Sequence, residues 1–167
     1  RIIEADRWAE VEQGVAQRVR VLEAFLDDVY GAGEVLDDDV VPRSVVMTSP
    51  HYHRVVAGIQ PPNGVRVHIS GIDLVRDDHG DFRVLEDNAR VPSGVSYVMT
   101  NRRAMSAALP EVFADHRIRP VSAYPRQLLH ALRAAAPAGV SDPTVVVLTP
   151  GVYNSAYFEH ALLARTM

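Results

Sequence analysis

The chain has 167 residues, of which 47% are hydrophobic and 23% are charged, a composition typical of a globular protein with one sizeable core or two small lobes. A formal net charge of −4 argues against nucleic acid or a membrane surface as partner, and no apolar run approaches the roughly 20 residues of a membrane-spanning helix. The absence of cysteine excludes disulfides, thiolate catalysis and cysteine-ligated zinc, and the absence of a signal-peptide pattern makes the cytoplasm the default location.

The first 31 residues predict a long amphipathic helix. Apolar residues recur at helical spacing from Trp8 onward, with Asp6 as a candidate N-cap and Gly31 as a natural stop. Arg18, Arg20 and the acids of the other face are expected to be solvated.

Residues 32–64 are expected to be connective. Residues 45–47 are a candidate short strand, and the three aspartates at 37–39 are typical of a polar turn rather than of a metal cluster. His51 and His53 have no third ligand in register, which favours a loop over a zinc site. The QPPNG run that follows predicts a turn.

A β-hairpin is predicted within residues 65–90, with Gly80 at positive φ in a two-residue loop. This loop places Asp73 opposite Glu86, and Asn88 shares the face of Glu86 because side chains alternate along a strand. A four-residue loop keeps the arrangement, whereas a three-residue loop breaks it unless a bulge restores it.

Asp73, Glu86 and Asn88 would together supply two carboxylates and a carboxamide, oxygen ligands that suit Mg²⁺. The alternative is the ordinary solvated face of a sheet. The other residues of these two faces are apolar: Val67, Ile69, Val75, Phe82 and Val84. A charge placed within an apolar face needs a partner, which could be a bound cation or Arg90.

Arg90 is a candidate for phosphate contact. It lies one alternation beyond Asn88 and projects on the same side if the strand continues. A structural salt bridge with Glu86 is the alternative.

A second helix is expected after Ser93 and Gly94, with apolar residues at helical spacing to Leu109 and a stop at Pro110. Ser93 can cap this helix, so that its first backbone N–H groups face an anion; a plain N-cap explains the pattern nearly as well.

The last third predicts a helix near residues 126–136, a buried strand at 145–148 and a helix from 154 to 165. A buried strand, a glycine turn and a helix resemble the first unit of a parallel α/β layer, in which ligands commonly sit at such turns. The candidate substrate residues here are Asn154, Tyr157, Glu159 and His160. Of these, Glu159 and His160 could perform acid–base work.

The run GIDLVRDDHGDFRVLEDNARVPSGVSY resembles the metal-binding end of an ATP-grasp ligase, in which an acid on one strand and a Glu-x-Asn pair on the next hold Mg²⁺ ions at the ATP phosphates. The runs RVLEDN, RVPSGVSY and TPGVYNSAYFEHALLAR are similar to the circularly permuted ATP-grasp family, which includes glutathionylspermidine-synthase-like proteins. The resemblance extends over nearly the whole chain.

This resemblance implies ATP and Mg²⁺ as cofactors. It assigns the metal to Asp73, Glu86 and Asn88. It implies that Arg90 stabilises the transferred phosphoryl group and that Ser93 and Gly94 bind the nucleotide. The implied reaction joins a small-molecule or peptide carboxylate to an amine through an acyl phosphate.

The resulting expectation is a mixed α/β (α+β) fold. Residues 1–120 would form part of the permuted ATP-grasp domain, with an antiparallel metal-binding hairpin and flanking helices. Residues 121–167 would begin a Rossmann-like pre-ATP-grasp lobe.

All 17 basic residues are arginine. Since ATP-grasp enzymes typically hold phosphates with lysines, and since the chain ends directly after a helix, we expect a fragment of a longer ligase that binds ATP poorly by itself. Whether the fragment is an enzyme stays open, as do the substrates and the oligomeric state. The alternatives are a non-catalytic binding or scaffold domain and a metal-dependent phosphoester hydrolase.

Overall fold

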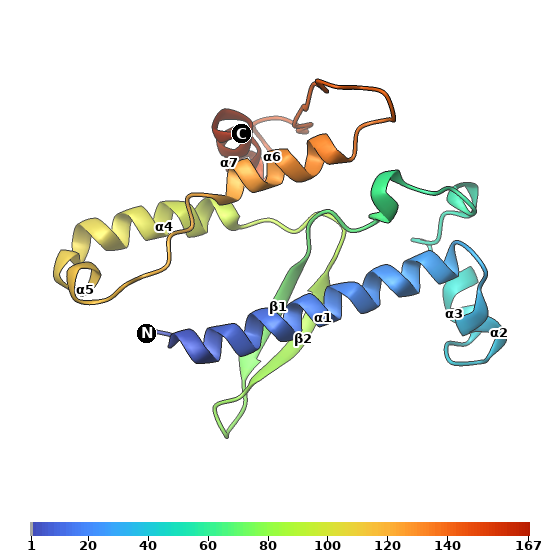
Figure 1. The fold of residues 1–167 in the computed structure, drawn as a ribbon, viewed down its shortest axis with the longest axis horizontal. Helices are drawn as coiled ribbons and strands as arrows, with labels where there is room; N and C mark the ends of the chain where they lie inside the picture. The colour runs from blue at the N-terminus through green and yellow to red at the C-terminus, as the bar shows by residue number, and fades with distance from the viewer. Residues whose placement is uncertain (1) are drawn as a thin grey trace. The chain divides into compact units, whose positions relative to one another are not determined.

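The computed structural model describes residues 2–167 and contains two compact units, Arg1–Val91 and Pro92–Met167 (Figure 1). The first unit contains, in chain order, α1 (Ala5–Val29), α2 (Glu34–Asp37), α3 (Arg43–Met47), η1 (Arg54–Val56), η2 (Pro62–Gly64), β1 (Gly71–Arg76) and β2 (Phe82–Asn88). The second contains α4 (Val95–Ala108), α5 (Pro110–Asp115), α6 (Tyr124–Ala134) and α7 (Tyr157–Thr166). The fold is therefore mixed, with helices and a two-stranded antiparallel sheet. The boundary expected near residue 120 lies inside the second unit.

Helix α1 is the long helix that the sequence predicts, but its N-cap residue is not the predicted Asp6. Glu4 is the N-cap residue, so Asp6 lies in the first turn, where a carboxylate faces the positive end of the helix dipole. After the helix, a Cβ on Gly31 would lie 2.6 Å from the Asp27 carbonyl oxygen. Glycine is required there for close approach of the backbone.

Helix α1 packs against the hairpin, and Figure 1 shows it running across β1 and β2. Val11 and Val15 of α1 line a cavity of about 290 Å³ together with Leu74 of β1 and Val84 of β2. The apolar stripe of the helix therefore covers the face of the sheet that carries Leu74 and Val84.

The hairpin loop has three residues, so the predicted two-residue loop is wrong. The Asp77 N–H donates to the Asp81 carbonyl oxygen at 3.0 Å, and Gly80 has the expected positive φ of 85°. Asp73 nevertheless lies opposite Glu86, because a bulge between the Leu74 and Asp73 pairs leaves one extra residue on β2. A three-residue loop with a compensating bulge is the combination that preserves the predicted pairing.

The bulge changes the surroundings of the acids. Val84 pairs with Leu74, which follows Asp73 directly and so lies on the other face of the sheet. The expectation that Val84 shares the face of Glu86 is therefore wrong. Asp73 and Glu86 are exposed to solvent, so burial in an apolar face does not force a partner on them.

The segment at residues 43–47 is the helix α3, so the predicted strand there is wrong. A three-residue apolar run fits a short helix as well as a strand. Pro42 precedes the first turn, and the Thr48 hydroxyl closes the last by donating to the Ser44 carbonyl oxygen at 2.7 Å. Nearby, the ring of Tyr52 stacks on Tyr30 with centroids 5.2 Å apart, and the two flanking histidines lie outside α-helix and strand.

In the second unit, α4 and α7 contact each other through the rings of Tyr97 and Phe158, whose centroids lie 5.0 Å apart. Leu128 of α6 is buried, together with Ser96 and Glu159. The predicted helices near 126–136 and 154–165 are present as α6 and α7. No helix within residues 2–167 has the length and hydrophobicity needed to cross a membrane.

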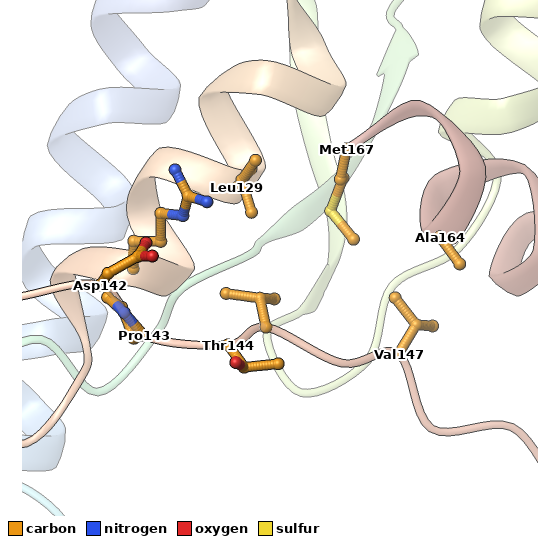
Figure 2. Close-up of a pocket in the computed structure, with 9 residues that line it drawn as sticks. Leu129, Asp142, Pro143, Thr144, Val147, Ala164 and Met167 are labelled. Atoms are coloured by element: carbon orange, nitrogen blue, oxygen red, sulfur yellow. The ribbon is translucent and has the colours of Figure 1, made fainter.

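Residues 145–148 form no strand, so the predicted buried strand is wrong. Within residues 2–167 the only sheet is the β1–β2 pair, and it offers this segment no strand partner. Val145 and Val147 line a cavity of about 370 Å³, whereas Val146 and Leu148 are 70% and 87% exposed. In Figure 2, Val147 and Ala164 lie toward one end of this cavity.

Candidate metal centre

The hairpin brings together the three side chains that the sequence proposes as metal ligands. Asp73 lies opposite Glu86, and Asn88 lies opposite Gly71, which has no side chain. The Asn88 amide nitrogen donates to Glu86 Oε1 at 3.2 Å. All three side chains are exposed and project from one face of the sheet.

The chemistry of this donor set fits Mg²⁺ bound together with a phosphate ligand. Two carboxylates and the Asn88 carbonyl oxygen are hard ligands, and Mg²⁺ in nucleotide sites uses one or two carboxylates plus phosphates and water. A cage built entirely from protein is not present: within residues 2–167, no group of three or more His, Asp or Glu side chains is arranged to hold a metal. The hairpin can therefore supply part of a coordination shell.

Asp87, between two of these candidate ligands, points the other way. The Arg18 guanidinium donates from Nε to Asp87 Oδ1 and from Nη2 to Asp87 Oδ2, each at 2.6 Å. These hydrogen bonds lower the pKa of Asp87 below its usual value. Arg18 is exposed, as expected, with 44% of its side chain accessible, but its partner Asp87 was not predicted. Helical spacing points to this contact, because Arg18 follows Val11 and Val15 by seven and three residues.

A second polar cluster fixes the tip of the hairpin. Asp77 Oδ1 accepts the N–H groups of His79 and Asp81 at 3.0 and 2.9 Å, while Oδ2 accepts from Arg83 Nε at 2.7 Å. The Arg83 hydrogen bond is the largest cause that lowers the pKa of Asp77, and the two backbone N–H groups add to it. Arg7 of α1 donates to Asp81 Oδ1 at 2.8 Å.

Arg90 is exposed and lies beyond the end of β2 at Asn88, so the strand does not carry it onto the ligand face by alternation. In the part of the chain that the structure describes, no ion pair joins Arg90 to Glu86. The salt bridge expected as an alternative role for Arg90 is therefore absent from residues 2–167.

The start of α4 binds a carboxylate from the same unit. Gly94, with φ of 117°, is the N-cap residue, and Ser93 makes no capping bond, so the expected Ser93 cap is wrong. Glu159 Oε2 accepts the N–H groups of Gly94 and Ser96 at 3.1 and 2.9 Å. The helix does attract an anion, as its dipole predicts, but that anion is the Glu159 side chain.

Glu159 is 4% exposed and Ser96 is fully buried. Burial raises the pKa of Tyr124, and the charge of Glu159 raises it further. This buried position makes Glu159 a link between α7 and α4 rather than a group that faces solvent. A contact to the start of α4 from a residue more than sixty positions later carries no local sequence signal.

The other candidate substrate residues surround the turn before α7. Asn154 Oδ1 accepts the Ala156 N–H at 2.9 Å, and His160 Nδ1 lies 2.8 Å from the Thr149 hydroxyl. Tyr157 is 36% exposed at the start of α7. The structure thus separates these residues from Glu159, which points to the start of α4.

The chain matches relatives of greater length. It is 60% identical to an uncharacterized protein of Mycobacterium tuberculosis, covering 100% of this chain and 30% of that protein. It is 48% identical to an uncharacterized protein of Synechocystis, covering 100% and 35%. A protein of Frankia casuarinae named provisionally as glutamate–cysteine ligase 2-2 is 47% identical, with 100% of this chain and 19% of that protein covered. The chain therefore spans about a third of its mycobacterial and cyanobacterial relatives.

A family model described as a circularly permuted ATP-grasp matches residues 1–167, the whole of the chain. The hairpin with its paired acids lies within this match. The chain belongs to the circularly permuted ATP-grasp family.

Proposed function

We propose that this chain is the metal-binding part of an ATP-dependent carboxylate–amine ligase. In this reaction a substrate carboxylate attacks the γ-phosphate of ATP, ADP leaves, and an amine displaces phosphate from the acyl phosphate to form an amide or peptide bond. The observation that carries the proposal is the pairing of Asp73 with Glu86, with Asn88 on the same face, in a chain of the ATP-grasp family.

The residues have separate roles in this proposal. Asp73, Glu86 and Asn88 would hold Mg²⁺, which when bound neutralises charge on the ATP phosphates. The exposed Arg90 guanidinium would stabilise the transferred phosphoryl group, since a cation placed where charge develops lowers the barrier. Such a reaction requires positioning and charge neutralisation rather than a protein nucleophile.

The proposed nucleotide contacts at Ser93 and Gly94 rest on the family resemblance. Gly94 donates its backbone N–H to Glu159, so this group is engaged before any ligand binds. The exposed Ser93 is the better candidate of the two. For the substrate side we propose Asn154, Tyr157 and His160, and we assign Glu159 a structural role.

Two finer assignments belong to the same proposal. The name of the Frankia relative concerns glutamate–cysteine ligation, which is also the joining of a carboxylate to an amine, and this supports the reaction class. The match covers 19% of that protein, so it does not select a substrate pair, and a glutathionylspermidine-synthase-like reaction is equally compatible. We also propose that residues 121–167 begin a Rossmann-like lobe; the two helices α6 and α7 support this.

A non-catalytic ATP-grasp-like binding domain is the second candidate. The observation in its favour is the absence of lysine, because ATP-grasp enzymes typically use lysines to hold phosphates. The two candidate functions differ in one measurable property: a ligase converts ATP to ADP when its substrates are present, whereas a binding domain does not.

The test is ADP release by the full-length protein with mixtures of carboxylates and amines. Glu86→Gln should reduce this release by roughly 10- to 100-fold, because a metal ligand is lost. Glu111→Gln, which changes an exposed acid on α5, should leave ADP release unchanged. Unchanged ADP release in Glu86→Gln would refute the metal assignment, and no ADP release by the parent protein would favour the binding domain.

A further inference from the structure

We infer that Arg18 is a positioning residue for the candidate metal centre: by holding Asp87 against α1, it aims Glu86 and Asn88 at the opposite face of the hairpin. The inference rests on the proposed function for its metal. It adds a residue from a different element, more than sixty positions away in the sequence.

The contact between Arg18 and Asp87 has a defined geometry. Both carboxylate oxygens are engaged, each at 2.6 Å, by two nitrogens of one planar guanidinium. A paired contact of this kind fixes orientation as well as distance, and a lysine could not reproduce it with its single ammonium group. The Asp87 side chain is 19% exposed, so it lies in the interface with α1.

The contact matters because of where the bulge lies. Between the loop and the bulge, Leu74 pairs with Val84 and Val75 with Arg83. If this register continued without a bulge, Leu85 would lie opposite Asp73, and Glu86 would turn toward α1. A shift of one residue moves every following side chain to the other face of a strand.

The direction of the Asp87 side chain differs between the register with the bulge and the register without it. In the observed, bulged register it pairs with Ile72 and faces α1, where Arg18 binds it. In the register without a bulge, Asp87 would point away from α1 and the bidentate contact would be lost. Arg18 therefore selects the register that places Glu86 and Asn88 on the ligand face.

The chain contains a matched control contact. Arg7, also on α1, donates to Asp81 Oδ1 at 2.8 Å and to the Gly80 carbonyl oxygen at 3.4 Å. This contact likewise joins α1 to the hairpin, but it lies on the loop side of the bulge. Its loss should weaken docking of α1 without changing the register beyond the bulge.

The first experiment uses the metal-free chain, so that it does not depend on the proposed function. Nuclear Overhauser contacts across the strands are compared in the parent chain, Arg18→Ala, Arg18→Lys and Arg7→Ala. We expect the Asp73–Glu86 contact to weaken or be replaced by an Asp73–Leu85 contact in Arg18→Ala. It should be partly retained in Arg18→Lys and unchanged in Arg7→Ala. An unchanged Asp73–Glu86 contact in Arg18→Ala would overturn the inference.

The second experiment measures Mn²⁺ binding by paramagnetic broadening at the hairpin. We expect on the order of ten-fold weaker binding in Arg18→Ala, a loss typical when groups that orient metal ligands are removed. Arg18→Lys should lie between Arg18→Ala and the parent, and Arg7→Ala should match the parent. Equal weakening in Arg7→Ala and Arg18→Ala would show that docking of α1, not register, is responsible, and would overturn the inference.

Failure of the proposed function gives a different result. If the parent chain does not bind Mn²⁺, or if Glu86→Gln binds it equally well, the metal site is refuted while the register contacts still decide the role of Arg18. If Arg18→Ala does not fold, Arg18→Lys decides, and an undisturbed register together with parental Mn²⁺ affinity would overturn the inference.

Discussion

Replacing Glu159 by alanine should loosen the start of helix α4. The Glu159 carboxylate accepts two backbone N–H groups of that start, and both Glu159 and Ser96 are buried. In the variant these N–H groups lose their acceptor, and their burial limits replacement by water. A conservative Glu159→Gln variant keeps one oxygen that can accept, so it should be less harmful.

The size of the effect follows from the two lost hydrogen bonds. A buried polar group left without a partner costs about 1–3 kcal/mol, and loss of an N-cap acceptor costs about 0.5–2 kcal/mol. Part of the loss is offset, because the variant no longer desolvates a carboxylate. We therefore expect Glu159→Ala to lower the free energy of unfolding by about 2–3 kcal/mol, and Glu159→Gln by about 1 kcal/mol.

The assay combines urea unfolding with hydrogen exchange of individual amides. Helix loss is followed by circular dichroism, because the only tryptophan, Trp8, lies on α1 and reports on the first unit. Exchange at the Gly94 and Ser96 amides should become faster in Glu159→Ala. The pKa of Tyr124 should also fall partway toward its ordinary value, because burial remains while the charge of Glu159 is gone.

A control variant separates this effect from general loss of charge. Glu111 is an exposed acid in the first turn of α5, and Glu111→Ala should change stability by less than about 0.5 kcal/mol. The reasoning would be refuted by unchanged exchange at Gly94 and Ser96 in Glu159→Ala, or by equal destabilisation in the two alanine variants.

Three further predictions concern the first unit. The hydrogen bond from Arg83 lowers the pKa of Asp77, so the ionised Asp77 carboxylate should stabilise the hairpin fully above about pH 4 and lose this effect as the pH falls through the lowered pKa. An NMR pH titration of the loop amides should show this step, and Asp77→Asn should abolish it. Gly31→Ala should lower the free energy of unfolding by about 1–3 kcal/mol, because the new Cβ would overlap the backbone. Gly14→Ala, whose Cβ would have no atom within 4 Å, should raise it by about 0.5–1 kcal/mol. Equal urea midpoints for the two variants would contradict both predictions. Deleting Leu85 should remove the bulge while preserving the pairing of Asp73 with Glu86 and the Mn²⁺ affinity. Cross-strand nuclear Overhauser contacts test the pairing, and paramagnetic broadening tests the affinity. A ten-fold loss of Mn²⁺ affinity would contradict this prediction.

The parts of the fold that the sequence predicts well are those determined by neighbours in the chain. Helices α1 and α6 follow from apolar spacing, and the hairpin follows from two runs of strand-forming residues around Gly80. The pairing of Asp73 with Glu86 was also predictable, but for a loop length that the structure does not have. The exact turn depended on Asp77, whose carboxylate binds two loop N–H groups and Arg83.

The parts that failed depend on partners distant in sequence. Residues 145–148 have the composition of a strand, yet a strand requires a neighbour to bind its backbone, and the sheet in residues 2–167 offers none. Their alternating exposure, with Val146 and Leu148 outward, is still the pattern of an extended segment. The contact of Glu159 with the start of α4 likewise joins residues more than sixty positions apart, and the sequence does not predict it.

The hairpin shows how these two kinds of information combine in one site. Local pattern places two acids and an amide within a few residues of a turn, but it leaves the register open by one residue, and that one residue decides which face the ligands occupy. The bulge resolves this in favour of the Asp73–Glu86 pair, and the contact that distinguishes the two registers comes from Arg18 on α1. Helical spacing places Arg18 one turn after Val15, next to the stripe that faces the sheet, and its guanidinium binds Asp87 although 44% of the Arg18 side chain is exposed. An arginine at this spacing on a helix therefore predicts a carboxylate partner on the facing strand. Here that partner is Asp87, which lies between the candidate metal ligands Glu86 and Asn88.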